Sequence, residues 1–161
     1  MNTVSCKLNS HNVKETMVLG RRLAGHLKTG DLVALVGIFG AGKTYFTKGI
    51  ARGLGVKRIS EVISPSFTLC NIHKARRLNL YHFDVQRLPN ARELLRLGFT
   101  DAFIDGVCVV EWADKWTGLI KFSNVLRIEF KLKSKHERLL EFRSKDKRWL
   151  KIMKQLRREV V

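Results

Sequence analysis

Gly37-Ile38-Phe39-Gly40-Ala41-Gly42-Lys43-Thr44 matches the phosphate-binding pattern G-x-x-x-x-G-K-[ST] at every fixed position. We call this stretch the glycine loop. The apolar run from Leu32 to Val36 stands before it and is typical of a buried parallel strand. After it, apolar residues recur at helical spacing as far as Leu54, and Gly55 gives a stop signal. A strand, a glycine-rich loop and a helix in this order predict an α/β fold in which the loop binds a nucleotide.

The residue types in the glycine loop suit phosphate chemistry. Glycines let backbone N–H groups turn inward with no Cβ in the way. These groups and the following helix N-terminus form a concave site for an anion. The Lys43 ammonium would reach the β- and γ-phosphates of a nucleotide, and the Thr44 hydroxyl would bind Mg²⁺. The alternative is a glycine-rich turn that contains a lysine by chance.

Length and composition indicate one domain and, by default, a cytoplasmic location. The chain has 161 residues, of which 45% are hydrophobic, so it can bury a core and is not of the disordered class. It has no apolar run of membrane-spanning length and no apolar signal-peptide segment. The scattered cysteines Cys6, Cys70 and Cys108 are typical of free thiols, not of a disulfide framework or a zinc site.

The net charge of +17 is unusual. It is densest in the last 35 residues, where 13 basic side chains stand against 5 acidic ones. Such a charge attracts nucleic acid, acidic partners or anionic surfaces. The alternative is that the basic side chains only solvate the surface, and both interpretations stay open at this point.

Other elements follow from apolar periodicity and turn signals. We expect strands over Val4–Leu8, Phe67–Ile72, Leu78–Phe83, Val107–Val110, Val125–Lys133 and Leu139–Arg143. We expect helices from a Ser10 cap to Leu27, from Lys43 to Leu54, from Ala91 to Leu97 after an Asn90 cap, and from Ser144 to Val160.

The last of these helices is basic and amphipathic, and it follows the expected nucleotide-binding domain of residues 1–143. Its segment, residues 144–161, either packs on the same domain, which we favour, or docks on an acidic surface of a partner. The apolar side of the helix consists of Trp149, Ile152, Met153, Leu156 and Val160.

A second feature that indicates a nucleotide site is the apolar run that ends at Glu111. Four apolar β-formers, Val107 to Val110, would carry this residue to the C-terminal end of a buried strand, and ligands of open α/β sheets collect at that edge. A carboxylate there would hold Mg²⁺ or its water shell. The alternative is a solvent-exposed glutamate that ends a core strand, and the glycine loop upstream makes this the weaker interpretation.

Four motifs in register make a family recognisable. They are Gly37 to Thr44, Ser64-Pro65-Ser66-Phe67-Thr68-Leu69, Tyr81-His82-Phe83-Asp84 and Val109-Val110-Glu111-Trp112. Their order and spacing resemble the TsaE (YjeE) family, a small P-loop ATPase of bacterial tRNA threonylcarbamoyladenosine (t6A) synthesis. The resemblance runs from about Ser10 to about Arg143. It implies a P-loop NTPase-like three-layer fold with a mixed, mostly parallel sheet flanked by helices.

The resemblance also implies a function. It implies hydrolysis of ATP to ADP with Mg²⁺ in a complex with the TsaB and TsaD proteins, and low activity without these partners. In that family TsaD transfers a threonylcarbamoyl group to adenosine 37 of tRNAs reading ANN codons, and ATP hydrolysis resets the complex. Contact with tRNA would come through the complex.

Residue roles carry over by position. The resemblance assigns phosphate binding to Gly40, Ala41, Gly42, Lys43 and Thr44, and magnesium binding to Thr44 and Glu111. Catalysis is assigned to Lys43, Asp84 and Glu111, where the Asp84 carboxylate would orient the attacking water or hold a metal-bound water. The alternative for Asp84 is an ordinary strand-end residue.

Three further residues complete the expected nucleotide site. Ser66 matches a loop that faces the γ-phosphate and is a candidate phosphate sensor, with an ordinary Ser-Pro turn as the alternative. Tyr45 follows the glycine loop, and Trp112 would pack near the nucleotide or the partner, with core packing as its alternative. His82, in contrast, is expected to be packed or hydrogen-bonded, not a catalytic base.

The chain departs from the family at a few positions. Ile38 stands where Asp is common, Tyr45 where Thr is usual, Ser66 replaces a usual Thr and keeps the hydroxyl, and Val85-Gln86 replaces Leu-Tyr. Nucleotide binding should survive these changes, and the hydrolysis rate is where we expect an effect. Two alternative functions use the same loop: a nucleotide or small-molecule kinase, and a basic nucleic-acid-binding NTPase module.

Overall fold

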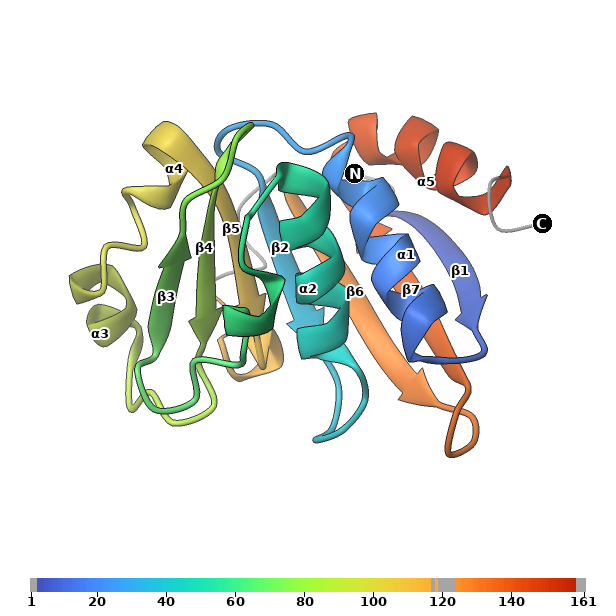
Figure 1. The fold of residues 1–161 in the computed structure, drawn as a ribbon, viewed down its shortest axis with the longest axis horizontal. Helices are drawn as coiled ribbons and strands as arrows, with labels where there is room; N and C mark the ends of the chain where they lie inside the picture. Colours follow the sequence, from blue (N-terminus) through green and yellow to red (C-terminus); the bar gives the residue numbers. More distant parts are fainter. Residues whose placement is uncertain (1–2, 117, 119–123, 159–161) are drawn as a thin grey trace.

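The computed structural model describes residues 3–116, 118 and 124–158 of the chain (Figure 1). No helix in these ranges is long and apolar enough to cross a membrane. The strands are β1 (Val4–Ser10), β2 (Leu32–Val36), β3 (Cys70–His73), β4 (Asn79–Asp84), β5 (Gly106–Glu111), β6 (Val125–Leu132) and β7 (Arg138–Ser144). The helices are α1 (Val13–Ala24), α2 (Lys43–Leu54), α3 (Ala91–Arg96), α4 (Ala102–Asp105) and α5 (Arg148–Arg158), with 3₁₀ turns η1 (Ile59–Glu61) and η2 (Ala113–Lys115).

The strands form one seven-stranded mixed sheet in the order β1-β7-β6-β2-β5-β4-β3. Its centre is parallel: β2 pairs with β5 and β6, and β4 pairs with β5. Its margins are antiparallel, because short turns join β3 to β4 and β6 to β7, and short turns permit only antiparallel pairing. With β1 also antiparallel to β7, parallel pairing is confined to the centre and covers less of the sheet than expected.

Helices cover both faces of the sheet and make two hydrophobic cores. Residues of α1, α2 and α5 share one core cluster, and residues of α3 and α4 share the other. In β2, Val33 and Leu35 belong to the first cluster, whereas Leu32 and Ala34 belong to the second. A strand buried on both faces needs an unbroken apolar run, which is the pattern that predicted this strand.

Glycines bring α1 and α2 into backbone contact. A Cβ built on Gly49 would lie 2.1 Å from the carbonyl oxygen of Met17, and one built on Gly20 would lie 2.2 Å from that of Phe46. Neither position has room for a larger side chain. The contact therefore fixes the position of α2, whose N-terminus begins at the glycine loop.

Several predicted boundaries are wrong for local reasons. Ser10 ends β1, paired with Arg138, and does not cap α1; the cap is Asn12, whose side chain accepts a hydrogen bond from the Glu15 N–H at 2.9 Å. α1 ends at Ala24, not at Leu27. The predicted strand Phe67–Ile72 begins only at Cys70, because residues 66–68 form a turn.

The C-terminal helix packs on the same core as the rest of the chain. Trp149 is fully buried, and Ile152, Met153 and Leu156 join it in the cluster with α1 and α2. An ion pair of 2.7 Å joins Arg148 to the buried carboxylate of Asp31, at the start of β2. The helix begins at Arg148, four residues later than predicted, and Val160 lies outside the described residues.

Replacing Gly49 with alanine tests the α1–α2 contact. Helix propensity alone favours alanine by about 1 kcal/mol, but the new Cβ would collide with backbone. We expect Gly49→Ala to lower the free energy of unfolding by about 1–3 kcal/mol in a denaturant titration. The control Val18→Ala, on the exposed side of α1, should change it by less than about 0.5 kcal/mol. A Gly49→Ala protein as stable as the control would contradict the close packing.

Candidate functional site

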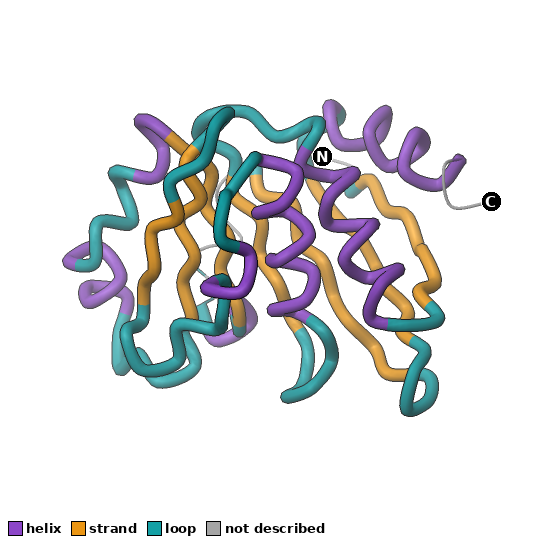
Figure 2. The backbone as a smooth tube through the Cα atoms, viewed as in Figure 1, coloured by secondary structure: helices purple, strands orange, loops and turns teal. Residues whose placement is uncertain are grey.

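The glycine loop lies at the C-terminal edge of the parallel strands. It joins the end of β2 to the start of α2, and Figure 2 shows it among the loops along one edge of the sheet. A cleft of about 220 Å³ opens there. The sequence assigned ten residues to the site, and all of them line this cleft: Gly40, Ala41, Gly42, Lys43, Thr44, Tyr45, Ser66, Asp84, Glu111 and Trp112. Phe39, Ser64 and Gln86 complete the lining.

The loop backbone has the shape that an anion site requires. Gly40 and Gly42 have φ values of 75° and 106°, which side chains other than glycine rarely adopt. Gly42 is the N-cap of α2, and no side chain caps this helix end. The first N–H groups of α2 and the positive end of its dipole are therefore directed at the cleft, which suits a phosphate group.

Lys43 is the buried cation of the cleft. Its Nζ donates hydrogen bonds to the carbonyl oxygens of Gly37 at 2.6 Å and Ile38 at 2.9 Å, and it lies 4.0 Å from the centre of the Trp112 ring. Burial lowers the pKa of this ammonium, and the nearby carboxylates of Glu111 and Asp84 oppose that effect. These contacts hold the positive charge against the loop, where a phosphate would lie.

Thr44 and Glu111 meet across the cleft. The Thr44 hydroxyl donates to both carboxylate oxygens of Glu111, at 3.0 and 3.2 Å. A hydroxyl and a carboxylate side by side fit Mg²⁺, which prefers oxygen ligands and usually takes one or two from protein and the rest from phosphate and water. Within the described residues, no cluster of three His, Cys, Asp or Glu side chains is arranged to hold a metal ion. Thr44 and Glu111 would therefore be the ligands that the protein contributes to such a site.

Sheet register places a second carboxylate beside Glu111. Asp84 on β4 and Glu111 on β5 are register partners at the ends of parallel strands. The Asp84 carboxylate accepts hydrogen bonds from the Ser64 hydroxyl at 2.7 Å and from the Gln86 N–H at 2.9 Å. These bonds orient Asp84 and tie the Ser64–Ser66 segment to the cleft.

His82 is a residue of the site whose role the sequence did not reveal. Its Nε2 lies 2.8 Å from Oε1 of Glu111, and both side chains are buried. A packed or hydrogen-bonded histidine was expected, but the sequence did not name Glu111 as its partner. The imidazole shares the Glu111 carboxylate with Thr44, so the orientation of that carboxylate is fixed from two elements.

Arg138 is the residue that the sequence missed altogether. Its buried guanidinium donates from Nε to the Ala41 carbonyl at 3.1 Å and from Nη1 to the His136 carbonyl at 2.6 Å. It thereby ties the glycine loop, through the Ala41 carbonyl, to the start of β7. A single arginine at the start of a strand carries no sequence signal of this contact.

Trp112 follows Glu111 in a backbone conformation that is rare for its type. Its φ is 61°, in the left-handed region. Such conformations cost energy and cluster at functional sites, where the surrounding structure maintains them. Here the turn carries the indole from the end of β5 back over the Lys43 ammonium.

Comparison with known proteins points to one family. The family model described as "Threonylcarbamoyl adenosine biosynthesis protein TsaE" matches residues 10–140. A relative from Bacillus subtilis, named tRNA threonylcarbamoyladenosine biosynthesis protein TsaE, is 44% identical over 108 residues, which are 66% of this chain and 66% of its own length. One of the same name from Rickettsia prowazekii is 37% identical over 101 residues, 63% of this chain and 69% of its own. Both matches thus span about two thirds of the relative.

The fold has a counterpart among solved structures. The crystal structure of YdiB from Bacillus subtilis superposes with a TM-score of 0.79 at 33% sequence identity. The match covers 99% of this chain and 98% of that one. The similarity therefore extends over the whole sheet and its helices, not over the glycine loop alone.

Removing the imidazole of His82 tests its role beside Glu111. We expect His82→Ala to raise the Mg²⁺ concentration needed for half-maximal ATP binding by about 10- to 100-fold. Groups that orient a metal ligand have effects of this size on metal affinity. The measurement is a Mg²⁺ titration of ATP binding. His82→Gln, which keeps an N–H donor, should recover part of the loss, and His26→Ala should have no effect. An unchanged Mg²⁺ requirement in His82→Ala would contradict the assignment.

Proposed function

The chain belongs to the TsaE family, which acts in the biosynthesis of threonylcarbamoyladenosine in tRNA, and from this membership we propose that it is a Mg²⁺-dependent P-loop ATPase of that process. The observation that carries the proposal is the convergence of Thr44, Glu111 and Asp84 at the mouth of the glycine loop. A phosphate cradle, two oxygen ligands and an oriented carboxylate are the parts that nucleotide hydrolysis needs.

The chain's own residues would bind and position the nucleotide. N–H groups of the glycine loop and of the first turn of α2 would hold the β- and γ-phosphates, and the Lys43 ammonium would offset their charge. Thr44 and Glu111 would hold the cation, which would neutralise part of the phosphate charge when bound. The half-buried Trp112 and the exposed Tyr45 ring both line the cleft, where they could contact the rest of the nucleotide.

Asp84 is the residue suited to the water that attacks the γ-phosphorus. Two donors, Ser64 and Gln86, hold its carboxylate, so it enters the reaction already oriented. The water oxygen forms the new bond to phosphorus, the bond to the ADP oxygen breaks, and the Asp84 carboxylate accepts the water proton. Ser66 lies in the segment that the Ser64 bond ties down, where its hydroxyl can sense the γ-phosphate.

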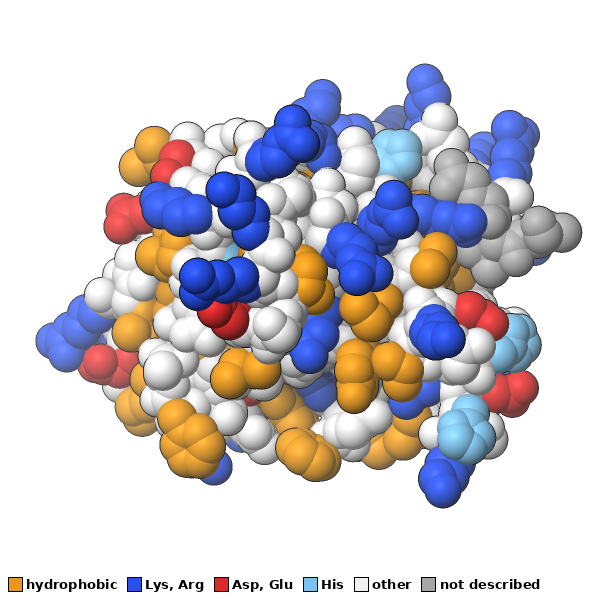
Figure 3. Space-filling model, viewed as in Figure 1, with side chains coloured by type: hydrophobic (Ala, Val, Ile, Leu, Met, Phe, Trp, Pro, Cys, Tyr) orange, Lys and Arg blue, Asp and Glu red, His pale blue; other side chains and the backbone are white. Residues whose placement is uncertain are grey.

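The rim of the cleft supports coupling to partners. Phe39 is 87% exposed and Phe67 is 82% exposed, and Ile38 and Ile63 are exposed beside them. Figure 3 shows hydrophobic side chains gathered along this edge of the molecule. Large apolar groups in contact with water mark an interaction site. We assign this rim to binding of TsaB and TsaD, which would complete the site. ATP hydrolysis by the complex would take place in the cytoplasm. It would serve the threonylcarbamoylation of adenosine 37 in tRNAs reading ANN codons.

The ATPase proposal is tested with Asp84→Asn. This change keeps the shape of the side chain and removes the proton acceptor, so we expect kcat to fall by about 10²- to 10⁴-fold while ATP still binds. Phosphate release with and without the partner proteins is the measurement, and Glu137→Gln, an exposed carboxylate elsewhere, is the control. Full activity in Asp84→Asn, or transfer of the γ-phosphate to a small acceptor in place of water, would contradict the proposal.

The partner proposal is tested at the rim outside the cleft lining. We expect the double change Ile63→Ser and Phe67→Ser to weaken the affinity for the TsaB–TsaD pair at least about tenfold, since buried aromatic anchors dominate such interfaces. Ile104→Ser is the matched control, because Ile104 is 77% exposed on a different element. If the double variant and the control lost the same affinity for the partners, or if neither lost any, the rim would not be part of the interface.

A further inference from the structure

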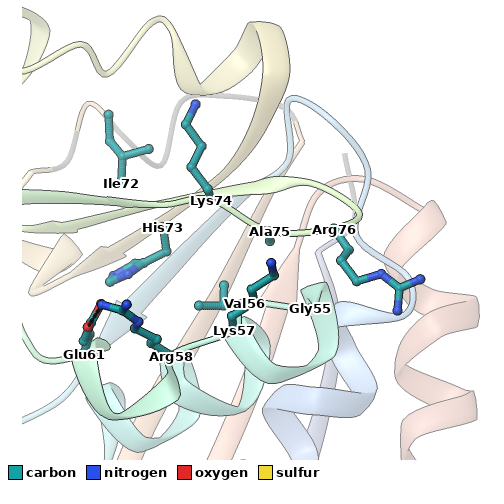
Figure 4. A pocket seen from close by; sticks show the side chains of 10 residues that line it. All are labelled: Gly55, Val56, Lys57, Arg58, Glu61, Ile72, His73, Lys74, Ala75 and Arg76. Atoms are coloured by element: carbon teal, nitrogen blue, oxygen red, sulfur yellow. Dashed lines mark hydrogen bonds and ion pairs between the residues drawn. The ribbon is translucent and has the colours of Figure 1, made fainter.

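A larger hollow, of about 470 Å³, lies at the opposite end of α2 from the glycine loop (Figure 4). The segment Gly55–Arg58 forms one wall, and the turn His73–Arg76 between β3 and β4 forms the other. A bridge between Val56 and Ala75 joins the two walls. α2 has 12 residues, so its rise of 1.5 Å per residue separates this hollow from the glycine loop by about 18 Å. We call it the basic cleft.

The charge of the basic cleft is strongly positive. Its lining holds Lys57, Arg58, Lys74 and Arg76 against one acidic residue, Glu61. Glu61 pairs with Arg58 at 3.0 Å, so it offsets only one of the four cations. The other three side chains are exposed.

The turn that carries two of these cations is firmly held. Arg77, next to Arg76, donates from its guanidinium to the carbonyl oxygens of Ala24 and Leu27, at the end of α1. The backbone N–H of Arg77 also donates to the Leu54 carbonyl. Lys74 and Arg76 are therefore presented by a backbone fixed against both helices.

The cations do not converge on one point. In Figure 4 the side chains of Lys57, Lys74 and Arg76 extend in different directions around the opening. Figure 3 shows Lys and Arg side chains gathered over the same end of the molecule, and Figure 1 shows α5 along that edge. The exposed basic residues of α5 extend the charge: Lys151, Lys154, Arg157 and Arg158.

We propose that the basic cleft binds the phosphate backbone of RNA, with Lys57, Lys74 and Arg76 each contacting a phosphate group. A spread of exposed cations along a fixed edge fits a chain of phosphates better than one compact anion. RNA is favoured over an acidic protein because the proposal rests on the proposed function, which supplies an RNA substrate. The opposite edge carries the nucleotide site and its apolar rim, so RNA and partner proteins would use separate surfaces.

The test compares two triple variants of the full chain with the same change in charge. One removes the cleft cations by Lys57→Ala, Lys74→Ala and Arg76→Ala. The control removes exposed cations elsewhere by Arg92→Ala, Lys133→Ala and Lys135→Ala. Binding of a fluorescent tRNA transcript is followed by anisotropy from about 50 to 200 mM salt, the range over which phosphate contacts weaken.

The triple variant that lacks the cleft cations, which we call the cleft triple, should weaken tRNA binding at least about tenfold more than the control variant does. It should also reduce the slope of log K against log salt by about 2–3, because each lost phosphate contact contributes roughly 0.7–0.9. Equal effects of the two triples would overturn the proposal. It would also be overturned if the cleft triple lost affinity for the partner proteins but not for tRNA, or if inorganic phosphate displaced tRNA at constant ionic strength.

Basal ATP hydrolysis separates this proposal from the proposed function. The cleft cations lie outside the nucleotide site, so the cleft triple should hydrolyse ATP at the wild-type rate. Wild-type protein that binds tRNA through the cleft but hydrolyses no ATP would contradict the proposed function alone. Wild-type protein that hydrolyses ATP but shows no cleft-dependent tRNA binding would contradict this inference alone.

Discussion

The Glu111 carboxylate is the point at which three elements of the fold meet. It stands at the end of β5, accepts hydrogen bonds from Thr44 on the first turn of α2, and pairs with His82 on β4. Each bond is short only if the register of β4 on β5 and the position of α2 above the sheet are both correct. The geometry of the site is thus a direct consequence of the packing, not an addition to it.

The packing of α2 has consequences at both of its ends. Backbone contact with α1 through Gly20 and Gly49 fixes the helix. At its N-terminus, open N–H groups and a buried lysine face the cleft beside two carboxylates. At its C-terminus, the chain turns into the basic cleft, where the cations outnumber the carboxylates. One rigid helix therefore separates the candidate nucleotide-binding site from a cationic surface.

Local features of this molecule were predictable from the sequence, and long-range ones were not. The order and position of β2, the loop after it and α2 were predicted correctly, because their signals lie within about twenty consecutive residues. The contacts His82–Glu111 and Arg138–Ala41 join residues 29 and 97 positions apart, so they depend on sheet register that no local pattern encodes. Competition between neighbouring polar residues explains a smaller error: Ser10 and Asn12 both suit a helix cap, but β1 continues through Ser10.

The central claim is that the glycine loop holds the phosphates of a nucleotide, and direct binding of ATP tests it most closely. Calorimetric titration of the wild-type protein with ATP and Mg²⁺ should give saturable one-to-one binding. Lys43→Ala removes the cation held between the loop carbonyls and Trp112, and it should weaken binding at least about tenfold, the effect expected for a lost charged hydrogen bond. Equal affinity of Lys43→Ala and wild type for ATP would contradict the account.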